Sequence, residues 1–79
     1  MDLFELIMTN VGCLYISDLK LEKYNHVAKI LMCDIDFKRY SISELEDMAE
    51  YLYNKKIHFN TLIDAEEFFY REKNTVKVF

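Results

Sequence analysis

The chain has 79 residues, 52% of them apolar and 30% charged, and its 14 acidic and 10 basic side chains give a net charge of −4. This composition is typical of a folded protein, because disordered chains contain fewer apolar and aromatic residues, and the length predicts a single compact domain over residues 1–79. The acidic balance argues against direct nucleic-acid binding, which normally requires a basic surface.

The N-terminal half contains patterns for two helices and two strands. Asp2 is suited to cap a helix that ends near Gly12, and residues 13–16 form a short apolar run that fits either a strand or an extended connector. A second helix is expected from residue 17 to about residue 31. Residues 33–38 then alternate between apolar and polar side chains, which indicates another strand over about residues 32–39 because successive strand residues point to opposite faces.

The C-terminal half contains the clearest helix signal. Residues 41–44 read Ser-Ile-Ser-Glu, the spacing of a capping box, and they predict a helix that ends at Asn54. Residues 56–59 form a short strand pattern, residues 62–72 a further helix, and residues 75–79 a closing strand. The order of elements predicts an α+β fold, with three to four helices packed on a short two- or three-stranded sheet.

The negative charge is concentrated in residues 34–50, which contain six acidic and two basic side chains and so account for a net charge of −4. On the predicted helix, Glu44, Asp47 and Tyr51 have the i, i+3, i+7 spacing of one stripe away from the apolar face. Tyrosine beside carboxylates suits protein recognition, because tyrosine buries a large area at low entropic cost. The predicted partner-binding residues are Asp34, Asp36, Glu44, Glu46, Asp47, Glu50 and Tyr51.

A similar group, Glu66, Glu67 and Tyr70, follows on the next predicted helix. The alternative for both groups is a solvated helix face that serves solubility alone, with tyrosine packed along its neighbours.

Two cysteines and two histidines, Cys13, His26, Cys33 and His58, make up the residue types of a tetrahedral zinc site. A small domain gains stability from a metal cross-link, because the binding energy becomes folding energy. The spacing lacks a close Cys-x-x-Cys pair, and His26 and Cys33 would lie roughly 10 Å apart on one continuous helix. Zinc bound by these four residues is therefore one hypothesis, and buried cysteines with two ordinary histidines are the alternative.

No catalytic motif is present, and we expect the protein not to be an enzyme. The single glycine, Gly12, excludes glycine-rich phosphate loops, which need several such positions. A domain of this length can hardly enclose a catalytic cleft. A helix-turn-helix DNA reader is disfavoured as well, because Asp64, Glu66 and Glu67 begin the second helix where phosphate contacts need positive charge.

The whole chain, small and acidic with Tyr51 beside the acidic residues 34–50, resembles the phage-encoded anti-CRISPR inhibitors of Cas9. The resemblance implies a protein that docks on a basic surface of the nuclease and blocks loading of guide or target DNA. Carboxylates would then occupy positions that face Arg and Lys of the partner. Some members of this group also use a metal to hold a small fold. The 10 basic residues here depart from the most acidic DNA mimics and favour a protein-to-protein patch.

The alternative function is a structural or assembly module that self-associates through aromatic residues. Its candidate residues are Tyr51, Tyr53, Phe68 and Phe69. For either function a cytoplasmic location is expected, that of the host cell if the protein is phage-encoded. No apolar run approaches the roughly 20 residues of a membrane-spanning helix, and no signal peptide is recognised.

Overall fold

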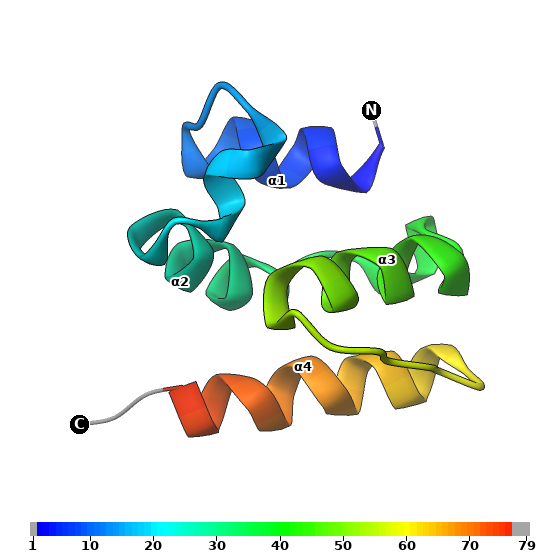
Figure 1. Cartoon of the computed structure of the whole chain (residues 1–79). Helices are drawn as coiled ribbons and strands as arrows, with labels where there is room; N and C mark the ends of the chain where they lie inside the picture. The colour runs from blue at the N-terminus through cyan, green and yellow to red at the C-terminus, as the bar shows by residue number, and fades with distance from the viewer. Residues whose placement is uncertain (1, 77–79) are drawn as a thin grey trace.

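The structure is a computed structural model that describes the backbone of residues 2–76 and the side chains of residues 2–72. All regular secondary structure in this part of the chain is helical (Figure 1). The α-helices and the two 3-10 helices, labelled η, are α1 Leu3–Val11, η1 Ile16–Lys20, α2 Glu22–Leu31, η2 Phe37–Arg39, α3 Ile42–Tyr53 and α4 Leu62–Val76.

The predicted α+β fold is wrong, because residues 2–76 contain no strand. Residues 13–16 lead from α1 into η1, and residues 32–39 form a turn followed by η2. Residues 56–59 lie in the connector between α3 and α4. Of the strand predicted at 75–79, residues 75 and 76 continue α4, and residues 77–79 lie outside the described residues.

In residues 32–39, the alternating pattern predicts correctly which side chains are buried, but the segment forms no sheet. Cys33 and Phe37 are buried, whereas Asp34, Asp36 and Lys38 are exposed, as the period-two pattern predicts. The backbone N–H groups bond locally instead, since those of Cys33 and Asp34 donate to carbonyls of the last turn of α2. A strand needs a second strand as its hydrogen-bonding partner, and none lies beside this segment in the described chain.

The helices form three layers, with α2 and α3 between α1 and α4 (Figure 1). Both α1 and α4 contact α2 and α3, while α1 and α4 do not contact each other within the described residues. The buried side chains form one cluster in which Leu3, Ile7, Met48 and Phe69 are nearly inaccessible. No helix in the described range has the length and apolar character needed to cross a membrane.

The predicted helix ends of α1 and α3 are confirmed. The Asp2 and Ser41 side chains accept from the amides of Glu5 and Glu44, at 2.9 and 3.1 Å, and both capping boxes are complete. The two helices end on residues in the left-handed region, Gly12 at φ 89° and Asn54 at φ 56°. Such caps depend on a few neighbouring residues, which explains why sequence alone locates them.

Candidate functional site

Two carboxylates of the acidic stretch hold the connector between α3 and α4. The Ile57 amide donates to Glu50 Oε2 at 3.2 Å, and the Phe59 amide donates to Glu46 Oε2 at 2.7 Å. His58 Nδ1 lies 2.9 Å from the same Glu46 oxygen. We call Glu46 and Glu50 with these contacts the carboxylate clamp.

The geometry of the clamp follows from two repeats. Glu46 and Glu50 are about one helical turn apart, a rise of about 6 Å for four residues, and the amides of Ile57 and Phe59 are separated by about 6.6 Å in extended chain. Residues 54–61 run back along α3, so that the later amide meets the earlier carboxylate (Figure 1). The clamp therefore takes the place of the strand partner that the pattern at residues 56–59 predicts.

The other predicted partner-binding residues near the helix starts also have intramolecular roles. Glu44 completes the capping box of α3, with its Oε1 accepting from the Ser41 amide at 3.1 Å. Asp36 caps η2 through the Lys38 amide at 3.2 Å, and its Oδ2 lies 3.7 Å from Arg39 Nε. The Asp36–Arg39 pair is highly exposed, so it contributes little to stability.

Tyr51 joins α3 to the N-terminal third of the chain. Its hydroxyl donates to the Ile16 carbonyl at 3.2 Å, and its ring meets the Phe4 ring edge-on with centroids 5.7 Å apart. Lys20 Nζ lies 4.3 Å from the centre of the same ring, a cation–π distance. Tyr51 is thus a packing residue, and the stripe that it was predicted to form with Glu44 and Asp47 is not an open surface.

Asp34 and Asp47 are the two predicted partner-binding residues that are exposed and without a hydrogen bond or ion pair inside the described chain. Five of the seven residues therefore contribute to helix caps, the clamp or packing. Acidic side chains at helix starts and beside free amides are a structural requirement of this fold. A charge run in the sequence does not distinguish that requirement from a binding surface.

The aromatic residues of the predicted assembly surface lie in or against the core. Phe68 and Phe69 are buried, and the Tyr53 ring meets Phe68 edge-on at 5.1 Å between centroids. Burial raises the pKa of Tyr53, and the nearby Glu72 and Cys33 raise it further. The Tyr53 hydroxyl is buried without a hydrogen-bond partner in the described part of the chain.

The four predicted zinc ligands lie in different surroundings. Cys33 is buried, with its thiol donating to the Phe69 carbonyl at 3.4 Å, and Cys13 is half-buried after α1. His26 is exposed on α2, and His58 lies against Glu46. Within residues 2–72, no group of three or more His, Cys, Asp or Glu side chains is placed to hold a metal ion. The zinc hypothesis therefore has no assembled ligand set here.

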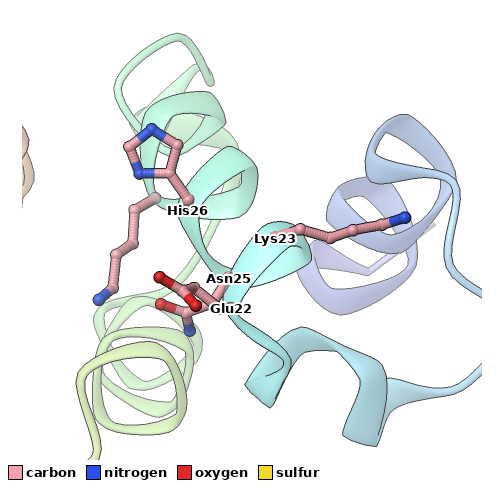
Figure 2. Close-up of a pocket in the computed structure, with 5 residues that line it drawn as sticks. Glu22, Lys23, Asn25 and His26 are labelled. Carbon is pink, nitrogen blue, oxygen red and sulfur yellow. The ribbon is translucent and has the colours of Figure 1, made fainter.

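A cavity of about 690 Å³ lies along α2 (Figure 2) and is lined by Glu22, Lys23, Asn25, His26 and Lys29. Figure 2 shows Lys23 pointing to the opposite side of α2 from Glu22 and Asn25. The Asn25 amide group donates to the carbonyls of Leu19 and Leu52, at 2.9 and 3.0 Å, and so ties α2 to η1 and α3. Burial lowers the pKa of Lys29, and the Glu72 carboxylate acts in the opposite direction. The lining has mixed charge and selects no ligand class.

The six most exposed large apolar side chains lie at two places, and Val27 and Ile30 on α2 are less exposed. The first place is the segment before and after η1, where Leu14 is 83%, Tyr15 68% and Leu21 54% exposed. We call Leu14, Tyr15, Ile16 and Leu21 the apolar connector. The signal in the sequence is an apolar run with no helical periodicity, which fits an extended connector as well as a strand.

The second place is the solvent side of α4. Ile63 and Tyr70 are 63% and 53% exposed, and the exposed Glu67 lies between them at i, i+4, i+7 spacing. We call Ile63, Glu66, Glu67 and Tyr70 the outer α4 face. The core side of this helix is formed by Ala65, Phe68 and Phe69. In the sequence, the signal for this face is that Ile63 and Tyr70 lie outside the apolar stripe that contains Ala65, Phe68 and Phe69.

Comparison with known proteins adds no assignment, since no protein-family model, curated protein or solved structure matches the chain.

Proposed function

We propose that this protein is a small binding inhibitor that docks through the outer α4 face onto a basic surface of a nucleic-acid-handling protein. The observation that carries the proposal is the exposure of Ile63 and Tyr70 with Glu66 and Glu67 beside them. Large apolar side chains that stay in solvent mark interaction surfaces when they occur together, and tyrosine is a frequent anchor of such surfaces. The two carboxylates have no intramolecular hydrogen bond or ion pair within the described residues.

The charge of α4 supports a basic partner. Residues 62–72 contain four acidic side chains and one basic side chain, Arg71, a net charge of −3. An acidic face of this kind attracts Lys and Arg over several ångströms and raises the rate of encounter with a basic protein. The acidic residues of α3 contribute to the same field, although Glu46 and Glu50 are held in the clamp.

The class resemblance to anti-CRISPR inhibitors makes Cas9 the first partner to test, in the cytoplasm of a host cell. A docked inhibitor of this type would block guide or target DNA by covering the basic channel that holds it. Neither a cofactor nor a catalytic step is required, because occupation of the surface is sufficient for inhibition.

The test measures binding of the purified protein to purified Cas9, with and without guide RNA, by biolayer interferometry. The variant Glu66→Lys/Glu67→Lys is compared with Glu22→Lys/Asp34→Lys, which makes the same change in net charge at exposed positions elsewhere. We expect the α4 variant to bind at least about tenfold more weakly, since reversal of one close charge pair costs about 1.4 kcal/mol or more. The control variant should lose much less affinity.

If both variants lose the same affinity, binding depends on net charge alone, and the outer α4 face is not the docking surface. Absence of binding by the native protein, in a preparation whose circular dichroism shows it folded, would contradict Cas9 as the partner.

A further inference from the structure

The apolar connector is a surface that the proposed function does not use. Most of the Leu14 and Tyr15 side chains is exposed to solvent there, although a domain of 79 residues needs its large apolar side chains to form a core. The connector lies on the α1 side of the α2–α3 layer, and α4 lies on the opposite side (Figure 1). One molecule therefore presents two separate apolar surfaces on opposite sides.

The two surfaces differ in charge. Residues 12–28 contain Lys20 and Lys23 against Asp18 and Glu22 and have no net charge, because the ammonium of the next base, Lys29, lies over the Tyr53 ring and interacts with Glu72 of α4. The Asp18 carboxylate accepts from the Tyr15 amide at 3.3 Å and is thus engaged in the local turn. Residues 42–72 contain eight acidic and three basic side chains, a net charge of −5. The connector side is therefore close to neutral, with Lys20 and Lys23 as its bases, whereas the α4 side is strongly acidic.

We infer that the apolar connector is covered by the outer α4 face of a second copy of this chain, in a head-to-tail contact. Leu14, Tyr15, Ile16 and Leu21 would pack against Ile63 and Tyr70, with Lys20 and Lys23 near Glu66 and Glu67. Charge favours this pairing over a contact between two outer α4 faces, whose carboxylates repel each other, and Lys20 and Lys23 carry the charge opposite to that of Glu66 and Glu67. A contact between two different patches is heterologous, so it extends into longer assemblies unless it closes into a ring.

The strength of this contact follows from its size. A stable interface buries about 800 Å² on each partner, roughly a sixth of the 5121 Å² surface of this molecule. The six exposed apolar side chains with their flanking charges make a smaller contact, and we expect a dissociation constant in the micromolar range or weaker. Because self-association uses the outer α4 face, it would compete with any other partner of that face. The inference itself does not depend on such a partner.

The test is sedimentation velocity of the full chain over a wide concentration range at low salt. One variant removes the connector surface, Leu14→Ser/Tyr15→Ser, and a second changes the α4 surface, Ile63→Ser/Glu67→Lys. Val27→Ser/Ile30→Ser is the matched control, since it removes exposed apolar side chains from α2. All six positions are exposed, so the variants should fold, which circular dichroism and thermal melting check.

For the native chain we expect an average mass that rises from the 9.6 kDa monomer past the dimer, and falls back at high salt. Each surface variant alone should remain monomeric, and the control should behave as the native chain does. Mixing the two surface variants should restore association that stops at the dimer, because the mixture retains one intact connector and one intact α4 face. No rise in native mass, association by one surface variant alone, or no association in the mixture would overturn the inference.

Discussion

Residues 13–16, predicted as a strand or an extended connector, and residues 56–59, predicted as a strand, are two short segments with large apolar side chains that lie very differently in the structure. In the second segment Phe59 is buried and Ile57 half-buried, whereas in the first Leu14 and Tyr15 are among the most exposed apolar residues of the protein. The difference lies in the neighbouring helix. The second connector runs along α3, where Glu46 and Glu50 accept from its amides, whereas the Tyr15 amide of the first donates to Asp18 within its own turn.

The segment at residues 56–59 packs against the core although it belongs to no sheet. Its amides need acceptors, because a buried N–H without one costs about 1–3 kcal/mol. Two carboxylates one helical turn apart supply them at alternate residues, Ile57 and Phe59, and the side chains of these same two residues face inward while His58 between them is exposed. Where no such carboxylates are available, the apolar side chains stay in solvent, where another protein can cover them.

The largest effect is expected from removal of one aromatic side chain in each connector. Phe59→Ala should lower the free energy of unfolding by about 3–5 kcal/mol, because it leaves a cavity among the rings of Phe68 and Phe69. Tyr15→Ala, at a 68% exposed position, should change it by less than about 0.5 kcal/mol. Urea unfolding followed by circular dichroism measures both. Similar values for the two variants would show that the connectors are equally packed and remove the basis of the comparison.

The carboxylate clamp is tested at two adjacent residues of α3. Glu46→Ala should destabilise the protein by about 1.5–3 kcal/mol, because the Phe59 amide loses a charged acceptor and His58 loses its partner. Asp47→Ala removes an exposed carboxylate that has no partner in the described chain, and its effect should stay within about 0.5 kcal/mol. Thermal and urea unfolding of both variants give the difference. A loss for Asp47→Ala as large as for Glu46→Ala would mean that general charge on α3, and not the clamp, sets stability.

A smaller effect is expected at alkaline pH from Tyr53, whose ring packs against Phe68 beside the second connector. Because the pKa of Tyr53 is raised in the folded state, its stabilising contribution is complete below the ordinary tyrosine pKa of about 10. It is lost as the pH rises above that value, since the unfolded chain ionises first.

Lys29, whose pKa is lowered by burial, acts in the opposite direction, because the cost of keeping its ammonium buried falls as the pH rises toward the ordinary lysine value.

The measurement is unfolding by urea at several pH values around and above 10, together with absorbance titration of the tyrosines. Tyr53→Phe should lose less stability over this range than the native chain does, and its titration should lack the last tyrosine to ionise. If the tyrosine lost in Tyr53→Phe is one that ionises together with the others near the ordinary pKa, Tyr53 is accessible and the packing around the second connector is loose.

The predictions from sequence succeeded where a few neighbouring residues decide the structure. The capping boxes at Asp2 and Ser41 and the left-handed caps at Gly12 and Asn54 set the bounds of α1 and α3. The alternation at residues 33–38 also matched the burial of the side chains, with Cys33 and Phe37 buried and Asp34 and Asp36 exposed. The element type was wrong, because a period-two pattern records which face a side chain takes and carries no information about what bonds to the backbone.

The candidate site was harder to predict because the same acidic residues serve two purposes. Glu44 and Glu50 fit a binding stripe as well as they fit a cap and a clamp, and only the positions of the Ser41 and Ile57 amides separate the two roles. Tyr70 with Glu66 and Glu67 was indicated by the sequence, whereas the exposure of Leu14 and Ile63 was missed for the converse reason. Leu14 and Ile63 have the composition of core residues, and their exposure depends on which neighbours the fold brings near them.

From sequence alone it follows that this is a small acidic chain whose helices begin at Asp2 and Ser41 and whose negative charge lies largely in residues 34–50. Helix caps and charge counts depend on residues close in the chain, so they need no knowledge of the fold. The tertiary structure alone decided that Glu46 and Glu50 hold a connector and that the four Cys and His side chains do not converge. It also decided that free apolar surface remains at the connector before α2 and on α4, because each of these facts depends on contacts between segments far apart in the sequence.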